Sequence, residues 1–144
     1  MSGGSRNRAR QAAVQALYQW QLTQQPPDEI ESHFINDHEW EDVDLEYFHR
    51  LVREVPLHLH ELDDHLIPHL DRDIEEVDPV ERAILLIGAF ELEFHLEIPY
   101  RVVLNEAVEL AKTFGAEHAH KYINAVLDKV AGHLRAAEIA RKVC

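Results

Sequence analysis

The segment Asp78–Phe94 contains a run of apolar residues that leaves no polar face for about two helical turns. It begins with Asp78, Pro79 and Glu81. This order predicts a helix start, because aspartate caps free amide groups, proline fits the first turn and a glutamate at the third position can reach back. A helix that is apolar all round is normally buried, and the run is about half as long as the roughly 20 residues of a membrane span. We therefore predict a central core helix around which the rest of the chain packs.

The chain has 144 residues, which is long enough to bury a hydrophobic core, and we predict one domain over residues 1–144. The Gly/Ser-rich segment Met1–Ser5 is expected to be frayed. No segment resembles a signal peptide or is long enough to span a bilayer, which predicts a protein without membrane contact. The single cysteine, Cys144, supports no disulfide framework and favours a cytoplasmic location.

The net charge of −13 is unevenly distributed along the chain. Residues 1–27 carry three arginines and no acid, residues 28–99 carry 22 acids against four arginines, and residues 100–144 carry seven bases against five acids. Basic ends and an acidic middle suit a polyanion at one surface and a basic partner at another. The alternative, an acidic middle that only keeps the protein in solution, stays open on charge alone.

Helical spacing of apolar residues recurs in four further segments, at about residues 6–23, 44–66, 100–114 and 117–134. Pro56 predicts a kink or a break within the second of these. Asp28 and Glu31 form a capping-box pattern for a short additional helix, and Gly115 is expected to be a left-handed helix stop. No segment shows the alternation of a strand, so the predicted fold is all-α with six or seven helices and short connections.

The first predicted helix carries two stripes of different chemistry. One is apolar and predicted to be buried: Ala9, Ala13, Leu17 and Trp20. The other combines a cation, two amides and an aromatic ring: Arg8, Gln11, Gln15 and Tyr18. Cations bind phosphates, amides read base edges and tyrosine stacks on bases, so the second stripe is a candidate RNA-binding face. An ordinary solvated face with a half-buried Tyr18 explains the same pattern equally well.

Motifs of catalysis or cofactor binding are not found: there is no glycine-rich phosphate loop, no serine elbow and no CxxC pair. We therefore predict a protein that is not an enzyme and needs no cofactor. A cluster rich in histidine suggests zinc or nickel: His58, His60, Asp63, Asp64, His65 and His69. Pro68 separates His65 from His69, however, and His58 and His60 would point to different sides of a helix. We interpret these histidines as solvated residues that titrate near neutral pH, and predict no metal site.

Three segments of the sequence, taken together, resemble the NusB family of transcription antitermination factors. They are RNRARQAAVQALYQWQ (Arg6–Gln21), DPVERAILLIGAFEL (Asp78–Leu92) and IPYRVVLNEAVELAKTFGAEHAHKYINAVLDKV (Ile98–Val130). They occur in the family's order and spacing and span most of the chain, whereas Pro26–Asp71 matches less specifically. The resemblance implies a helical fold of two packed three-helix bundles. It also implies binding to the boxA sequence of nascent ribosomal RNA, together with the ribosomal protein NusE, in an antitermination complex on RNA polymerase.

The resemblance can be carried onto individual residues. The family's arginine-rich N-terminus and first-helix aromatic correspond to Arg6, Arg8, Arg10 and Tyr18, to which the second stripe adds Gln15. Its second RNA-contacting segment corresponds to Phe114, His118, Lys121 and Tyr122. The surface that faces NusE corresponds to Glu75 and Glu81. In many members position 118 is acidic, and His118 could instead gain positive charge and favour phosphate.

Two other classes of protein are considered beside this one. The same fold occurs as the N-terminal domain of RNA cytosine methyltransferases, and that function would require a catalytic domain beyond Cys144. The second alternative is a helical protein-binding scaffold without RNA contact. One form of it is a homodimer that buries the arginine-rich helix. RNA binding that falls steeply with added salt would distinguish an RNA-binding protein from such a scaffold.

Overall fold

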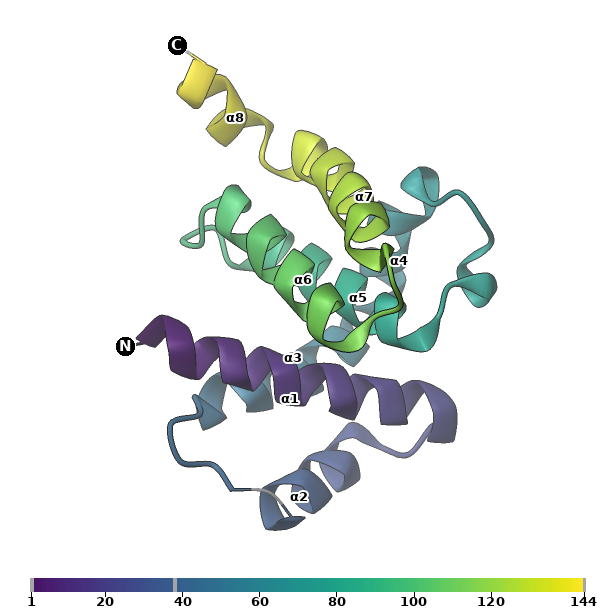
Figure 1. Ribbon diagram of the computed structural model, residues 1–144, viewed down its shortest axis with the longest axis vertical. Helices are drawn as coiled ribbons and strands as arrows, with labels where there is room; N and C mark the ends of the chain where they lie inside the picture. The colour runs from purple at the N-terminus through teal and green to yellow at the C-terminus, as the bar shows by residue number, and fades with distance from the viewer. Residues whose placement is uncertain (1, 38, 144) are drawn as a thin grey trace. The chain divides into compact units, whose positions relative to one another are not determined.

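The computed structural model describes residues 2–37 and 39–143, and within these residues it contains eight α-helices, two short 3-10 helices and no strand (Figure 1). The α-helices are α1 (Ser2–Thr23), α2 (Pro27–Asp37), α3 (Leu45–Leu57), α4 (Leu59–Leu66), α5 (Pro79–Phe94), α6 (Tyr100–Phe114), α7 (Ala119–Leu134) and α8 (Ala136–Val143). The 3-10 helices are η1 (Ile67–His69) and η2 (Ile74–Glu76). The all-α prediction is confirmed, although the helix count exceeds six or seven.

Two local features account for the additional helices. The apolar stripe over residues 44–66 is divided into α3 and α4, and the division falls at His58, shortly after Pro56. Proline lacks an amide hydrogen and disturbs the preceding turn, so the backbone hydrogen bonds of α3 end within one turn of Pro56. No helix was predicted after Leu134, whereas α8 follows directly after a break at Arg135.

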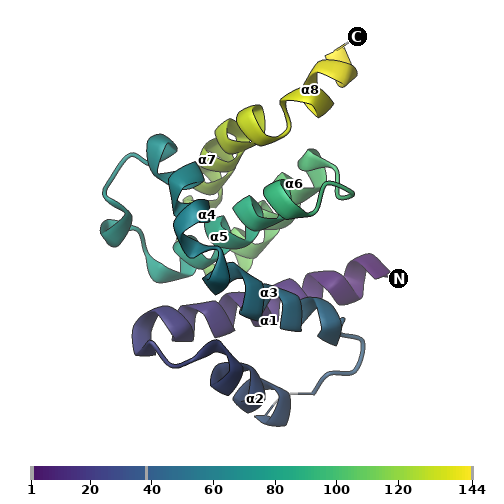
Figure 2. The ribbon, with the colours of Figure 1, turned by 180° about the vertical axis from the view of Figure 1, so that it is seen from behind.

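The chain divides into two compact units, Met1–Leu59 and His60–Cys144. In the first unit α1, α2 and α3 contact one another, as the views from two opposite sides show (Figures 1 and 2). In the second unit α5, α6 and α7 contact one another in the same pairwise manner, and α8 contacts α7. The predicted single domain stays a prediction.

The core of the first unit is built on the predicted apolar stripe of α1. Ala9, Ala13 and Leu17 are fully buried, and Phe34 of α2 lies 6.0 Å from Phe48 of α3, measured between ring centroids. Trp20, expected in the same stripe, is only half-buried. The first turn of the helix is described from Ser2, although we expected Met1–Ser5 to be frayed; Met1 lies outside the described residues.

Glu31 has a different role from the capping box that the sequence suggested. The residue is 6% exposed, and its carboxylate binds His49 and Arg53 of α3, with 3.4 Å between Arg53 Nη1 and Glu31 Oε1. At the start of α2, a backbone hydrogen bond from the amide of Ile30 to the carbonyl of Pro26 closes the first turn instead. Tertiary pairing with two basic groups therefore outweighs the local capping pattern.

The core of the second unit is α5, and its predicted start is confirmed. The carboxylate of Asp78 accepts hydrogen bonds from the amides of Val80 at 2.8 Å and Glu81 at 3.4 Å. Ten consecutive residues after Arg82 are buried: Ala83, Ile84, Leu85, Leu86, Ile87, Gly88, Ala89, Phe90, Glu91 and Leu92. At Gly88 an added Cβ would lie 2.6 Å from Leu127 Cδ1, so glycine permits the close approach of α5 and α7.

Among the described residues, no helix combines the length and apolarity that crossing a membrane requires.

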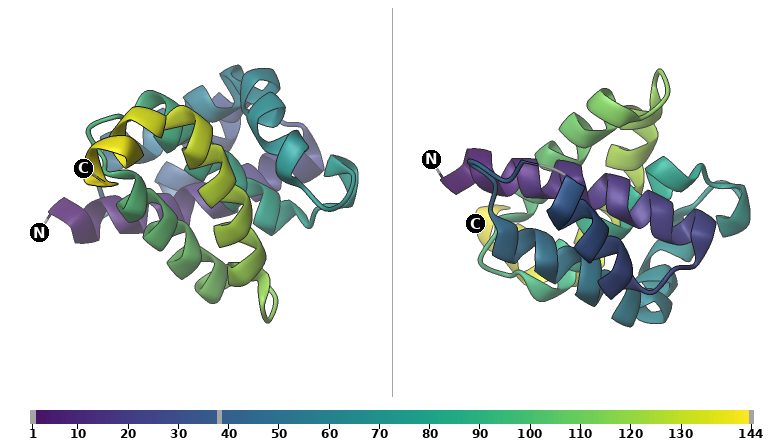
Figure 3. Two further views of the ribbon diagram at one scale, coloured as in Figure 1. Left: turned by 90° about the horizontal axis from the view of Figure 1, so that it is seen from above. Right: turned by 90° about the horizontal axis from the view of Figure 1, so that it is seen from below.

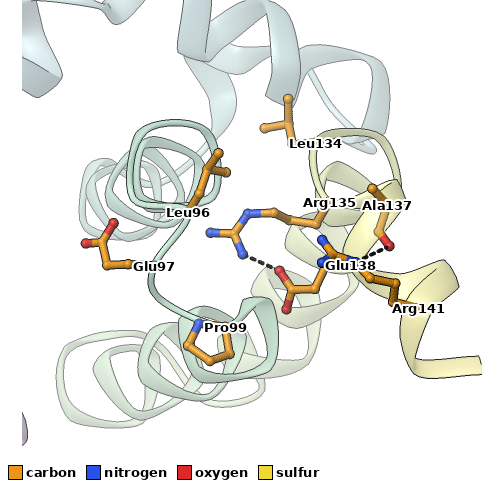
Figure 4. A pocket seen from close by; sticks show the side chains of 8 residues that line it. All are labelled: Leu96, Glu97, Pro99, Leu134, Arg135, Ala137, Glu138 and Arg141. Carbon is orange, nitrogen blue, oxygen red and sulfur yellow. Dashed lines mark hydrogen bonds and ion pairs between the residues drawn. The ribbon is translucent and has the colours of Figure 1, made fainter.

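The C-terminal end of α5 is capped by a side chain from far along the sequence. Arg135, only 4% exposed, follows α7 and donates hydrogen bonds to four backbone carbonyls, those of Glu91, Leu92, His95 and Ile98. The carboxylate of Glu138 in α8 accepts a fifth bond from Arg135 at 2.6 Å (Figure 4). It also accepts a hydrogen bond from the amide of Tyr100. The last carbonyls of a helix have no hydrogen-bond donor within the helix. Here the guanidinium of Arg135 supplies several of these donors.

Candidate nucleic-acid interface

The second stripe of α1 forms an accessible face of the first unit. The Arg8 side chain is 57% exposed and lies beside Asp42, with 3.4 Å between Arg8 Nη1 and the Asp42 carbonyl and 3.8 Å to its carboxylate. Gln15 is exposed, Gln11 is half-buried and Tyr18 is 38% exposed. An exposed pair such as Arg8–Asp42 contributes little stability, so the guanidinium can exchange this partner for another anion at little cost.

Two adjoining hollows run along this face and share Gln15 in their walls. The first, about 500 Å³, is lined by Tyr18 and Gln19 of α1 together with His33 of α2. The second, about 490 Å³, is lined by Arg8 and Gln11 of α1 together with Trp40 from the loop after α2. Each wall combines an aromatic ring with hydrogen-bonding groups. The wall of the second hollow also carries three carboxylates, those of Glu39, Glu41 and Asp42. The hollows suit planar rings with polar edges.

Arg6 and Arg10, although predicted beside Arg8, are oriented towards another part of the first unit. Their guanidinium carbons lie 4.5 Å and 5.5 Å from the ring centroid of Tyr47 in α3. Arg10 is only 3% exposed, while Arg6 is half-buried. Cations gain energy over an aromatic face, and this contact offsets part of the cost of burying Arg10. Arg8 is therefore the predicted arginine that the structure places most openly.

The turn between α6 and α7 carries the predicted residues of the second unit and projects beyond both helices (Figure 3). Lys121 is exposed in the first turn of α7, and Phe114 is half-buried at the end of α6. His118 is exposed and has a φ of 70°, in the left-handed region that few residues other than glycine adopt. Such strain persists where the surrounding structure enforces it, and it collects at functional sites.

Gly115 does not have the left-handed conformation that we expected. Its φ of −86° and ψ of 171° are extended, and the left-handed residue in this turn is His118. Glycine is nevertheless required for space, because an added Cβ would lie 2.8 Å from the carbonyl oxygen of Ala111. The prediction of a glycine stop was therefore right in place but wrong in mechanism.

Tyr122 is half-buried beneath a basic residue that sequence analysis missed. The guanidinium carbon of Arg72 lies 4.6 Å from the Tyr122 ring centroid. Arg72 Nε donates a hydrogen bond to Asp71 Oδ1 at 2.6 Å. This hydrogen bond holds the pKa of the Asp71 carboxyl below its usual value, and burial raises the pKa of Tyr122. One face of the tyrosine ring is thus already covered by a cation. The only available signal in the sequence was a lone arginine in an acidic segment.

The two acidic residues assigned to a partner surface differ in exposure. Glu75 is exposed in η2, whereas Glu81 is 9% exposed in the first turn of α5. Burial, and then the charge of Asp78, raise the pKa of Glu81, while Arg72 lowers it. A carboxylate that is destabilised by its surroundings is a candidate functional group, because folding alone does not favour its charge.

Comparison with known proteins identifies the class to which this arrangement belongs. The NusB family model matches residues 7–132. The transcription antitermination protein NusB of Nitrosococcus oceani is 59% identical over 133 residues, covering 92% of this chain and 89% of that protein. Its counterpart in Pasteurella multocida is 52% identical over 126 residues, covering 88% of each. The solved structure of T. maritima NusB matches with a TM-score of 0.77 at 27% identity, over 88% of this chain and 90% of that one. The chain belongs to the NusB family.

Proposed function

We propose that this protein acts in transcription antitermination by binding boxA-type single-stranded RNA of nascent ribosomal transcripts together with NusE. The complex operates on RNA polymerase in the cytoplasm. Family membership supports the antitermination role, since the relatives described above carry that name. The proposed RNA-binding residues lie on the α1 face of the first unit and, separately, at the turn between α6 and α7 of the second unit.

The observation that carries the RNA-binding proposal is the pair of hollows that meet at Gln15. A single-stranded RNA offers unstacked bases whose edges hydrogen-bond to amides and whose faces stack on aromatic rings. Gln11 and Gln15 supply the amides, and Tyr18 supplies a ring beside them. Arg8 at the end of the same stripe is suited to a backbone phosphate.

The acidic character of the middle segment supports a basic partner. Residues 28–99 carry 22 acids and four arginines, and the candidate partner residues Glu75 and Glu81 lie within them. A basic ribosomal protein would be attracted to this segment and held in register by it. A homodimer or protein-binding scaffold without RNA contact is the competing function, and the following experiment distinguishes it.

We expect the protein alone to bind boxA-type RNA weakly, because a net charge of −13 repels a polyanion and the local basic groups are few. Adding NusE should tighten binding, since a basic partner adds contacts and neutralises acidic charge. Fluorescence-anisotropy titrations at several salt concentrations, with and without NusE, measure both effects. Equal affinity in the two titrations, or an affinity independent of salt, would contradict the proposal and favour the scaffold.

Replacing Tyr18 with alanine should weaken RNA binding without unfolding the protein. Loss of one base–aromatic stack typically costs about 1–3 kcal/mol, and the middle of that range corresponds to a roughly ten- to hundredfold loss of affinity. Because Tyr18 is 38% exposed, the melting temperature should stay close to that of the wild type. Tyr18→Phe is the matched control and should retain most of the affinity if stacking dominates. A Tyr18→Ala protein that melts early but binds RNA normally would show that Tyr18 stabilises the core and does not bind RNA.

A further inference from the structure

A histidine and two glutamates of the second unit meet between α4 and α5, and none of the three is a residue assigned to RNA. Glu61 and His65 are four residues apart on α4 and therefore share a helix face. Glu93 approaches from α5, with 3.0 Å between His65 Nε2 and Glu93 Oε1. Each residue offers a ligand atom within 4.8 Å of the other two. This set was not considered from the sequence, because Glu93 lies 28 residues beyond His65.

The spacing of these atoms matches a metal-coordination shell. Zinc binds imidazole nitrogen and carboxylate oxygen at about 2.0–2.2 Å, which places neighbouring ligands roughly 3.0–3.4 Å apart in octahedral or tetrahedral geometry. The His65–Glu93 separation already has this value. Glu61 is exposed and lies on a helix face that points to the same place, so a rotamer change can bring its oxygen to bonding distance.

The electrostatics of the cluster favour a cation. Burial raises the pKa of Glu93, and the nearby Glu61 raises it further, whereas His65 lowers it. Two carboxylates that approach each other in a partly buried place repel one another, and a nearby cation favours the charged form of both. A divalent ion would supply that charge and bind the imidazole nitrogen as well.

The surroundings leave space beside this cluster. A hollow of about 420 Å³ adjoins His65 and is lined also by His69 of η1 and His133 of α7. The rings of His69 and His133 stack with 5.6 Å between their centroids. Of the three clustered residues only His65 lines this hollow, so water can reach the cluster from the His65 side, as it reaches open zinc sites with three protein ligands.

We propose that Glu61, His65 and Glu93 bind one divalent transition-metal ion of the zinc class. The ion joins α4 to α5, and an ion pair between Asp63 and Arg82, at 2.9 Å, also joins these two helices. Both helices are labelled in Figure 2. One imidazole with two carboxylates, from two helices, gives a three-ligand site that the RNA interface does not use. The competing explanation is a plain hydrogen bond between His65 and Glu93 with no ion.

The test is a calorimetric titration of the full chain with zinc chloride after chelator treatment, repeated with cobalt to follow the absorption of the bound ion. Wild type should bind one equivalent at a saturable site. His65→Ala and Glu93→Gln should each weaken this binding by more than about tenfold, because even outer partners of a metal site contribute that much. His60→Ala is the matched control, since that side chain is 96% exposed on the same helix, and it should leave the affinity unchanged.

A thermal melt gives a second measurement on the same proteins. Zinc should raise the melting temperature of wild type and of His60→Ala but not that of Glu93→Gln, because an ion that binds only the folded state stabilises it. Glu93→Gln keeps the size of the side chain, so it serves even if His65→Ala folds poorly. The proposal is overturned if wild type shows no saturable site, or if His60→Ala lowers the affinity as much as the site variants do.

Discussion

Replacing Arg135 with alanine should destabilise the protein by about 3–5 kcal/mol, the range seen when one partner of a buried charged network is removed. The guanidinium is buried and bonds four carbonyls at the end of α5 together with the carboxylate of Glu138. Without it, these carbonyls lose their partner and Glu138 keeps a partly buried charge. Denaturant unfolding followed by circular dichroism measures the difference.

Arg141→Ala is the matched control for this prediction. Arg141 lines the same pocket in Figure 4, but it is exposed, and its Nε lies 3.5 Å from the carbonyl of Ala137 in its own helix. Its loss should change stability by no more than about 0.5 kcal/mol. Arg135→Lys should fall between the two, because lysine keeps the charge but lacks the planar fork that reaches several acceptors. A stable Arg135→Ala protein would show that the carbonyls find water instead.

Glu81→Lys should weaken binding of the basic partner by more than about a hundredfold, because like charges placed together at an interface cost several kcal/mol. Folding should suffer less, since the start of α5 is capped by Asp78 and a capping contribution is worth about 0.5–2 kcal/mol. Partner affinity is measured per folded molecule by calorimetry with NusE, beside a thermal melt of each variant. A collapsed melting temperature with unchanged affinity would make Glu81 structural only.

Two further variants separate charge from folding at this surface. Burial raises the folded-state pKa of Glu81 above its ordinary value, so ionisation lowers stability as the pH rises through that pKa. Glu81→Gln removes this cost and should melt at or above wild type at neutral pH while losing partner affinity.

Glu75→Lys changes an exposed residue of η2 and should alter stability by less than about 0.5 kcal/mol. Its partner affinity should also fall if the assigned surface is correct.

Much of the candidate site was predictable because it lies on single helices. The spacing of Arg8, Gln11, Gln15 and Tyr18 places them on one face by helical geometry alone, and the structure lines two adjoining hollows with them. Trp40 was not predictable as a wall of the second hollow. It lies in a loop, and its position depends on packing against Phe48, with 4.7 Å between ring centroids.

The three N-terminal arginines show where prediction from the sequence ends. Arg6, Arg8 and Arg10 share one helix and one chemistry, so no local rule distinguishes them. Their different exposures follow from Tyr47, which draws Arg6 and Arg10 over its ring from a helix far along the chain. Arg72 over Tyr122 and Glu93 beside His65 are contacts of the same long-range kind.

Capping and periodicity act within a few residues, so they were enough to predict the all-α class, the start of α5 at Asp78 and most helix bounds. Tertiary structure alone decided which polar groups are buried and what they bind. Glu31 left its capping pattern for His49 and Arg53, and Arg135 reached carbonyls between 37 and 44 residues away. A buried polar group must be satisfied by whatever the fold brings near it, and sequence distance does not limit that choice.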